Sequence, residues 1–316
     1  MTQRRKFPVW AVAAGVATAF VVAREAARRA RNHTALSRAV RDDYASAFPV
    51  RRRFANIAGC NTHIYEAGPR DSDRPPLLLI HGGVIEGASW LDTVTALGTD
   101  RFVIAPDLPV HGASGYLPPH ILLRWLEEVV ESELPSARQF DLCGHSMGGG
   151  LALHYALRHS EKIRRLILCA PVSTGQIMPR IWPDLWNVGL FNLFPLHNTL
   201  IEKVWGDSAH ITTSQREQFS IIFRDFFFSP RWWWYLTGGL FWVLDLPPEK
   251  LKSITSPALF IWGERDQVVP FRGERTIQYI QAIPNARLHF LRGLGHMPQV
   301  EAPDVFNAVI RDFVAT

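Results

Sequence analysis

The 316-residue chain is 47% hydrophobic and 20% charged, an ordinary globular composition that can bury a sizeable core in one large α/β domain or two smaller ones. Its formal charge of +5 comes largely from arginines in residues 1–53. No recognition motif or basic stripe with interleaved aromatics is present, which argues against nucleic acid as a partner and favours anionic lipid headgroups beside a membrane segment. The three cysteines show neither a disulfide framework nor metal-ligand spacing and are expected to be buried thiols: Cys60, Cys143 and Cys169.

Residues 7–23, FPVWAVAAGVATAFVVA, contain no charge and are flanked by arginines. As a helix they reach about 25 Å, slightly less than a hydrocarbon core of about 30 Å. The flanking arginines can snorkel, and Trp10 suits a membrane interface. We therefore predict a retained membrane anchor, a single N-terminal span and a membrane-associated protein, followed by a basic helix and linker.

Two other interpretations of this segment stay open. It resembles a cleaved signal peptide with a small-residue site at residues 17–19, and TQRRKF resembles a twin-arginine export signal. The arginine excess after the span favours a cytoplasmic location for the rest of the chain, whereas a twin-arginine signal requires export. The side of the membrane is therefore not decided.

After residue 53 the pattern changes to alternating strands and helices. A hairpin is expected at residues 54–58 and 62–68, and helices at 121–134 and 148–160. Continuous apolar runs predict strands buried on both faces, which favours an α/β fold with a mainly parallel central sheet and helices on both faces. These runs are 75–83, 101–107, 140–146, 163–171, 257–266 and 286–291.

Residues 173–252 break this rhythm, because they lack such a strand and are dense in aromatic residues. We predict a helical cap over the rim of the sheet. It can be a small aromatic core, a lid over an apolar substrate cavity or a second membrane contact. The predicted organisation is an N-terminal segment (1–53), a core in two pieces (54–172 and 253–316) and the cap (173–252).

The stretch Gly144-His145-Ser146-Met147-Gly148 lies between a predicted buried strand and a predicted helix, the setting of a nucleophile elbow. A serine hydroxyl needs a base and an acid that orients the base, expected in the chain order serine, acid, histidine. Asp266 and His296 follow the next predicted strands in that order. HGGV at 81–84 ends another strand, and the backbone amides of Val84 and Met147 are the expected oxyanion donors.

Residues 54–316 resemble the α/β-hydrolase fold. GHSMGG, HGG, GERDQVVP and GHMPQVEAP are similar to the motifs of lidded serine lipases and esterases, monoacylglycerol lipases among them. Some membrane-anchored members likewise carry an N-terminal span. The resemblance implies Ser146 as nucleophile, Asp266 as acid and His296 as base.

DLPVHGAS at 107–114 resembles the family's Asp-x-x-Gly-x-Gly-x-Ser loop, but Val110 and His111 depart from it, so no catalytic role is assigned there. His81 and His145 are expected to make local hydrogen bonds, and His111 and His120 to lie in a solvated surface loop. Four aspartates are expected at a strand start, at caps or on the surface: Asp141, Asp207, Asp225 and Asp245.

The leading hypothesis is a serine hydrolase that cleaves carboxylic esters through an acyl-enzyme. The cap and the anchor indicate lipid-like acyl esters, and no metal or dissociable cofactor is implied. Carbon–carbon bond hydrolysis, perhydrolysis and acyl transfer stay open on the same triad, as does a catalytically silent, membrane-tethered binding protein. A serine at position 146 argues against epoxide hydrolases and dehalogenases, which attack with a carboxylate. Chain length, headgroup and oligomeric state are not indicated.

Overall fold

The computed structural model describes residues 39–135, 137–173, 201–227 and 246–315. The predicted membrane anchor and most of the predicted cap therefore lie outside the described residues. Within these four ranges, no helix is both long enough and apolar enough to cross a bilayer.

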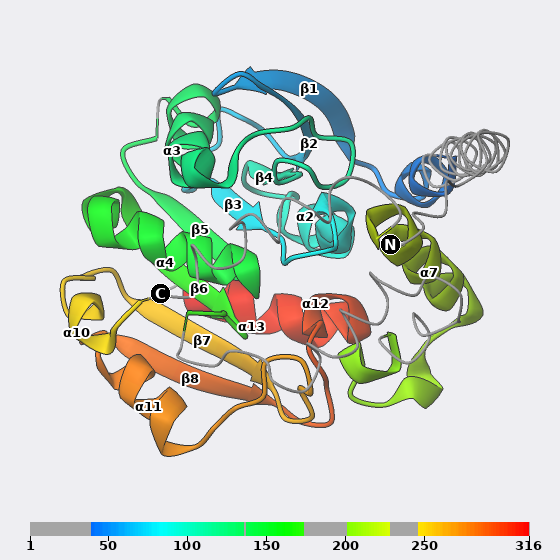
Figure 1. Ribbon diagram of the computed structural model, residues 1–316. Helices are drawn as coiled ribbons and strands as arrows, with labels where there is room; N and C mark the ends of the chain where they lie inside the picture. The colour runs from blue at the N-terminus through cyan, green and yellow to red at the C-terminus, as the bar shows by residue number, and fades with distance from the viewer. Residues whose placement is uncertain (1–38, 136, 174–200, 228–245, 316) are drawn as a thin grey trace, which may run out of the picture.

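An eight-stranded sheet forms the centre of the molecule, in the order β1-β2-β4-β3-β5-β6-β7-β8 from the top of Figure 1 to the bottom. The first two strands pair antiparallel, as do β2 and β4, and every later pair is parallel. The predicted, mainly parallel sheet is confirmed. The strands are β1 (Arg51–Ile57), β2 (Cys60–Ala67), β3 (Leu77–Ile80), β4 (Val103–Pro106), β5 (Phe140–His145), β6 (Ile163–Cys169), β7 (Ala258–Gly263) and β8 (Ala286–Leu291).

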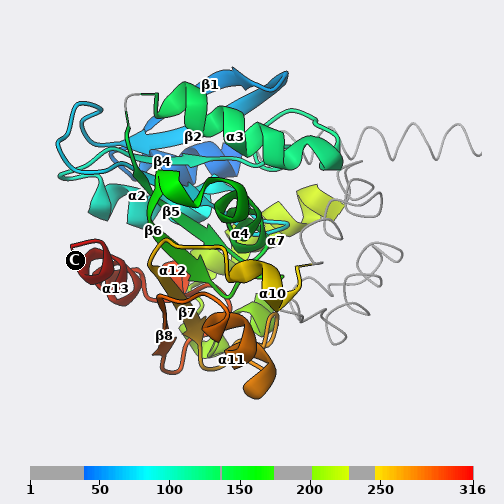
Figure 2. The same cartoon turned by 90° about the vertical axis from the view of Figure 1, so that its left-hand side faces the viewer.

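Helices cover both faces of the sheet, as Figure 2 shows edge-on. Side chains of successive strand residues point to opposite faces, so Leu77 and Leu79 of β3 join one buried cluster and Leu78 and Ile80 the other. The first cluster includes α2 (Leu91–Leu97), α13 (Pro303–Ala315) and the helical residues 39–46. The second includes α3 (Leu122–Glu133), α4 (Met147–His159) and α11 (Glu274–Gln281).

Shorter elements complete the described chain. They are η1 (Gly87–Trp90), η2 (Pro119–Ile121), η3 (Ser160–Lys162), η4 (Ser208–His210), α10 (Pro248–Leu251) and α12 (Pro298–Glu301). In the predicted cap, α7 (Thr213–Phe227) is described, and its Phe219 and Phe223 are buried with Trp205 in the same cluster as α4. The described part of the cap therefore packs as a continuation of the core, which agrees with the aromatic-core interpretation.

Two strands differ from the predictions. β1 begins at Arg51 rather than at residue 54, because residues 51–53 pair with residues 64–66 of β2. Arg51 and Arg53 also donate to the carboxylate of Glu66 on β2, at 3.2 and 3.0 Å. Strand β8 is not buried on both faces: it is the edge of the sheet, and Phe290 is 42% exposed.

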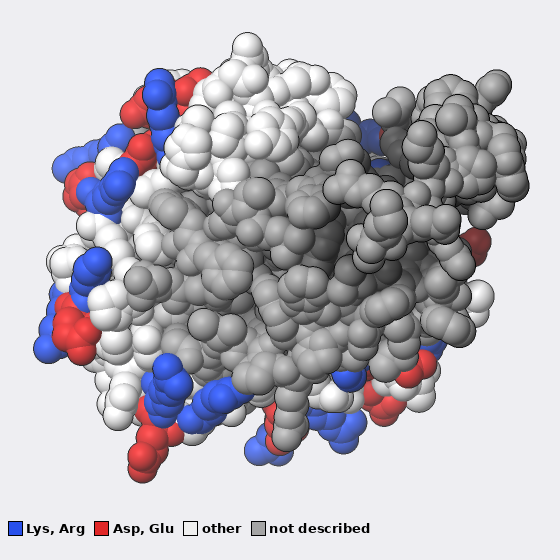
Figure 3. Space-filling view, in the orientation of Figure 1, with Lys and Arg blue, Asp and Glu red and all other residues white. Residues whose placement is uncertain are grey.

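On the surface, acidic and basic side chains lie intermixed along the left and lower margins of the view in Figure 3.

Asp141 is the second residue of β5 and is fully buried, so the expectation of a strand-start residue misses its main contacts. Its carboxylate accepts from Arg101 at 2.8 Å and from Arg164 at 2.6 and 2.9 Å. The two guanidinium groups offset the cost of burying this carboxylate in an apolar interior.

Asp207 and the three cysteines lie where the sequence predicted them. Asp207 is the N-cap of η4 and accepts from the amide of Ala209 at 2.9 Å, which confirms its prediction. The Asp225 side chain and Asp245 lie outside the described residues. All three cysteines are buried free thiols, as expected, and burial raises the pKa of the Cys143 and Cys169 thiols.

Candidate active site

Ser146 lies at the sharp turn from β5 into α4, with φ 51° and ψ −116°. A positive φ is strained for a residue with a Cβ and persists only where the surroundings hold it. Here the amide of Ser146 donates to the Cys169 carbonyl at 2.9 Å, and its own carbonyl accepts from Gly150 and Val172 at 3.1 Å. The backbone of the turn is thus fixed on both sides, as a nucleophile elbow requires.

The glycines around Ser146 are required by close packing. A Cβ on Gly144 would lie 2.4 Å from the carbonyl oxygen of Gly148, and a Cβ on Gly148 would lie 2.4 Å from those of Ile80 and His81. Side chains at these positions would push α4 away from β5 and from the end of β3. The predicted reason for the glycines, close approach of strand and helix, is confirmed.

Asp266 and His296 form a buried hydrogen-bonded pair. His296 Nδ1 donates to Asp266 Oδ2 at 2.8 Å, while Asp266 Oδ1 accepts from the amides of Val268 and Val269, both at 2.8 Å. Both residues are 5% exposed. With its Nδ1 proton held by the carboxylate, the imidazole keeps Nε2 available to accept another proton.

His145 connects this pair to the elbow. Its ring lies 4.7 Å from the His296 ring between centroids, and its Nε2 donates to the His296 carbonyl at 2.8 Å. Because His145 directly precedes Ser146, the acid–base pair lies at the same sheet edge as the serine. The expected local hydrogen bonding of His145 is confirmed, and burial together with the nearby His296 lowers its pKa well below the usual value.

The loop after β3 lies directly over the serine. A Cβ on Gly82 would come within 3.1 Å of the Ser146 Cβ and 2.8 Å of His145 Nδ1. Val84, in the same loop, has φ 68°, and Met147 is the first residue of α4, where amides have no intrahelical acceptor. The oxyanion roles of Val84 and Met147, like the catalytic role of each triad residue, stay predictions.

His81 and Asp107 make hydrogen bonds that hold the loop after β3 in place. His81 Nδ1 donates to the Gly82 carbonyl at 2.7 Å and its Nε2 accepts from the Leu108 amide at 2.8 Å, so its expected local bonding is confirmed. Burial lowers the pKa of His81, which suits this neutral arrangement. Asp107 accepts from the Gly87 amide at 2.6 Å and from His63 Nδ1 at 2.9 Å. The sequence motif around Asp107 was recognisable, but its contact with the loop after β3 was not.

His111 is buried, so its expected place in a solvated surface loop is wrong. Its Nδ1 donates to the Pro109 carbonyl at 2.9 Å, and its ring stacks on Phe226 of α7 with centroids 5.7 Å apart. The reason is that α7, from the predicted cap, covers the loop. His120 is exposed, as expected.

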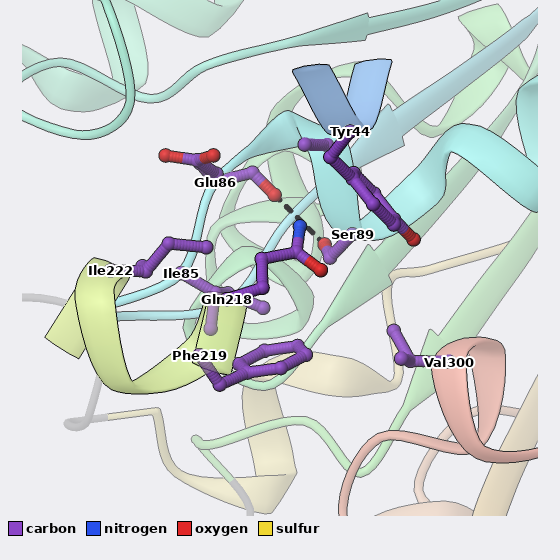
Figure 4. Close-up of a pocket in the computed structure, with 9 residues that line it drawn as sticks. Tyr44, Ile85, Glu86, Ser89, Gln218, Phe219, Ile222 and Val300 are labelled. Atoms are coloured by element: carbon purple, nitrogen blue, oxygen red, sulfur yellow. Dashed lines mark hydrogen bonds between the residues drawn. The ribbon is translucent and has the colours of Figure 1, made fainter. Parts of the chain in front are cut away.

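Figure 4 shows a small cavity where α7 meets residues 85–89, which follow the loop after β3. Gln218 and Phe219 of α7 face Ser89, whose Oγ donates to the Glu86 carbonyl at 2.8 Å, and Tyr44 and Val300 close the sides. Its volume of about 10 Å³ suits roughly one water molecule and no acyl chain. This cavity is therefore too small to be the predicted apolar substrate cavity.

Among the described residues, no group of three or more histidine, cysteine, aspartate or glutamate side chains is arranged to hold a metal ion. The described arrangement brings a serine in a strained turn and an imidazole bonded to a carboxylate to the same edge of the sheet, which suits nucleophilic attack assisted by proton transfer.

Comparison with known proteins places these features in context. The sequence model described as the alpha/beta hydrolase family matches residues 77–309. The chain is 30% identical to 2-hydroxymuconate semialdehyde hydrolase of Pseudomonas putida over 281 residues, which cover 82% of this chain and 92% of that protein. It is 28% identical over 252 residues to pimeloyl-[acyl-carrier protein] methyl ester esterase of Vibrio atlanticus, covering 76% and 94%. The crystal structure of carboxylesterase CesB (YbfK) from Bacillus subtilis superposes with a TM-score of 0.73 at 20% identity, covering 90% and 98%.

Proposed function

The chain belongs to the alpha/beta hydrolase family, and on that premise we propose that it is a serine hydrolase that cleaves carboxylic esters. The observation that carries the proposal is the buried Asp266–His296 pair, held beside the strained turn of Ser146 through His145. Ser146 is the proposed nucleophile, His296 the base and Asp266 the acid that orients it.

In the proposed reaction, His296 Nε2 removes the proton from Ser146 Oγ as the oxygen attacks the ester carbonyl. The amides of Val84 and Met147 stabilise the oxyanion, and one such donor contributes about 100–1000-fold in rate. His296 then gives its proton to the leaving alcohol. Water attacks the acyl-enzyme by the same path, with His296 again as base.

We favour lipid-like acyl esters as substrates. The cap segment is rich in aromatic residues, and its residues Val204 and Gly206 bond to the His296 loop and to Glu301. An apolar cap next to the base suits an apolar acyl chain. The resemblance to a carboxylesterase and to a methyl ester esterase supports ester chemistry.

Carbon–carbon bond hydrolysis is the second candidate, because the relative at 30% identity is a semialdehyde hydrolase and another is a 2-hydroxy-6-oxo-2,4-heptadienoate hydrolase. A dienoate substrate carries a carboxylate, which in a buried site needs a cation or hydrogen-bond donors. Within the described residues the two buried arginines, Arg41 and Arg101, are already paired with the carboxylates of Glu86 and Asp141. The two substrate classes are therefore separated by experiment.

The test compares two substrate classes on the purified full chain. We expect hydrolysis of p-nitrophenyl esters, faster for longer acyl chains than for acetate, and little cleavage of a 2-hydroxy-6-oxo-2,4-dienoate. A fluorophosphonate should label Ser146. Ser146→Ala should lose roughly a million-fold in turnover, by analogy with serine proteases.

Ser132→Ala is the matched control, because Ser132 is an exposed serine on α3 that bonds only the Glu128 carbonyl among the described residues. Faster cleavage of the dienoate than of every ester would assign carbon–carbon hydrolysis instead. Full ester hydrolysis by Ser146→Ala would refute the serine mechanism. Ester products formed with an added alcohol or peroxide would indicate acyl transfer or perhydrolysis, and absence of both labelling and turnover a silent binding protein.

We also propose that residues 7–23 anchor the protein to a membrane. The uncharged stretch between arginines supports this. The full chain should sediment with membranes and resist salt extraction, whereas a chain beginning at residue 39 should not. A shortened, freely soluble mature protein, identified by N-terminal sequencing, would favour a cleaved signal.

A further inference from the structure

Glu301, the last residue of α12, binds the loop that carries His296 on both sides of the histidine. Its carboxylate accepts from the amide of Gly295 at 2.9 and 3.0 Å and from the amide of Met297 at 3.1 Å. The same carboxylate accepts from the amide of Gly206, in the predicted cap segment, at 2.8 Å. One side chain therefore holds three backbone amides from two separate segments.

The amide of His296 itself is held by the cap segment, since it donates to the Val204 carbonyl at 2.7 Å. The three consecutive amides of residues 295–297 are thus all bonded, the outer two to Glu301 and the central one to Val204. These bonds act on the backbone, in addition to the contacts of His296 with Asp266 and His145.

The two segments touch along their backbones. A Cβ on Gly206 would lie 2.2 Å from the Gly293 carbonyl oxygen, and a Cβ on Gly295 would lie 2.3 Å from the Gly206 nitrogen. Glycine at both positions therefore permits the close contact across which the carboxylate reaches. A shift of the segment at residues 204–206 would be transmitted to the His296 loop through atoms already in contact.

We propose that Glu301 is a positioning residue for His296, and that it couples residues 204–206 of the cap segment to the geometry of the base. The inference rests on the proposed function, because it takes His296 as the base. It assigns Glu301 no contact with substrate: the residue acts through the backbone on either side of the histidine.

The chemistry of a carboxylate fits this role better than that of an amide. Two oxygens with about four lone-pair sites can accept all three N–H groups, and hydrogen bonds to an ionised acceptor are about twice as strong as neutral ones. Glutamine has one acceptor oxygen, and its NH₂ group would face amide donors. Replacement by glutamine would therefore leave at least one enclosed N–H group without its acceptor.

Glu301 is partly buried, and its hydrogen bonds reach two buried residues of the loop, Gly295 and Met297. Burial raises the pKa of Glu301 above its usual value, and the amides of Gly206, Gly295 and Met297 act in the opposite direction. Electrostatic hydrogen bonds are stronger in such surroundings than in water.

The test uses Glu301→Gln, Glu301→Asp and the matched control Glu264→Gln in the full chain. Glu264 is exposed and accepts from the amide of Gly293 at 3.0 Å, so it bonds the same loop without touching the neighbours of His296. For each protein we would measure kcat and KM on a short ester, the rate of fluorophosphonate labelling, the Tm, and the far-downfield proton resonance of the His296 Nδ1–H.

We expect Glu301→Gln to lower kcat and the labelling rate about 100-fold, the effect of misplacing a catalytic group by roughly 1 Å, with KM nearly unchanged. The Nδ1–H resonance should shift or broaden. Glu301→Asp keeps the charge on a shorter side chain and should recover part of the rate. Glu264→Gln should behave like the wild type in all four measurements.

Three outcomes separate the hypotheses. Wild-type kcat and an unshifted resonance in Glu301→Gln, with Ser146→Ala inactive, would overturn the positioning role and leave the proposed function standing. Activity in Ser146→Ala would instead overturn the proposed function. If Glu301→Gln does not fold, Glu301→Asp tests the proposal. Wild-type kcat and an unshifted resonance in that variant would contradict the positioning role of Glu301. A lowered kcat and a shifted resonance at wild-type Tm would support it.

Discussion

At the scale of single residues, the candidate site depends on two carboxylates, each of which uses both of its oxygens as hydrogen-bond acceptors. Asp266 uses one oxygen for two backbone amides and the other for His296, and Glu301 uses both of its oxygens for the loop around that histidine. Fixing each carboxylate through backbone amides sets the imidazole in one tautomer and one orientation. Two predictions belong to this scale.

Replacing Asp266 by asparagine should lower kcat about 10⁴-fold, because an amide can hold the imidazole in the wrong tautomer while the fold persists. Ester turnover and Tm would be measured together. Asp207→Asn is the control, since Asp207 caps a surface turn and is accessible to solvent. Near-normal turnover in Asp266→Asn would show that another carboxylate orients the base.

Acidification should destabilise the protein in the range of ordinary histidine titration. Burial lowers the pKa of His145 well below its usual value, so below about pH 6.5 the unfolded chain binds a proton that the folded chain does not. By linkage, the contribution of His145 to the free energy of unfolding is complete above that range. It falls as the pH drops towards the folded pKa, by up to about 1.4 kcal/mol per pH unit for one such group.

Urea denaturation between pH 7.5 and 5 tests this. In His145→Gln, which keeps a donor for the His296 carbonyl, the loss of stability over that range should be smaller than in the wild type. His120→Gln is the control, because His120 is exposed. The same pH dependence in His145→Gln and the wild type would rule out His145 as its source.

At the scale of elements, the contact between α4 and the ends of β3 and β5 decides where the serine stands. The helix comes so close that the carbonyls of Ile80 and His81 occupy the space of a Cβ on Gly148. This contact places Ser146 beneath the loop after β3, so packing and catalytic geometry depend on the same atoms.

Gly148→Ala should therefore destabilise the protein and lower ester turnover. Alanine gains about 1 kcal/mol of helix propensity over glycine, but overpacking against backbone typically costs about 1–3 kcal/mol, so the net effect is unfavourable. Gly115→Ala is the control: its Cβ would meet nothing closer than 3.5 Å and its φ is not left-handed. A more stable, fully active Gly148→Ala would contradict the close-contact explanation.

At the scale of the whole molecule, one buried ion cluster joins the sheet to the last helix. Asp141 on β5 accepts from Arg101, just before β4, and from Arg164 on β6, and Arg164 also donates to the Val314 carbonyl of α13 at 2.8 Å. The cluster lies at the amino ends of the parallel strands, opposite to the catalytic edge. It therefore bears on stability and leaves the chemistry untouched.

Asp141→Asn should lower the free energy of unfolding by about 3–5 kcal/mol, because Arg101 is 4% exposed and would lose its buried partner. Asp100→Asn, which removes an exposed partner of the same arginine, should cost at most about 1 kcal/mol. Chemical denaturation measures both. Equal losses of unfolding free energy in the two variants would show that burial does not distinguish the two ion pairs. The folded Asp141→Asn protein should keep the kcat of the wild type.

Most strands and helices could be predicted because each depends on neighbouring residues. The apolar runs between turns marked β3 to β7, and the glycines around Ser146 marked the turn from β5 into α4. The pairing of Asp266 with His296 followed from their positions after successive strands, since parallel strands end at one edge. Val84 and Met147 were proposed by the same logic and stay predictions.

Local sequence therefore determined the strand–helix alternation, the elbow and the acid–base pair, because burial pattern and turn chemistry act over a few residues. Only the tertiary structure decided the burial of His111 under α7 and the exposed face of β8. The same holds for the pairing of Asp141 with two arginines and for the hydrogen bonds of Glu301 to the His296 loop. Most of these depend on which distant segment covers a residue, and Glu301 joins the His296 loop to a segment 95 positions earlier in the chain. Such contacts form when elements pack, and no local pattern of residue types encodes them.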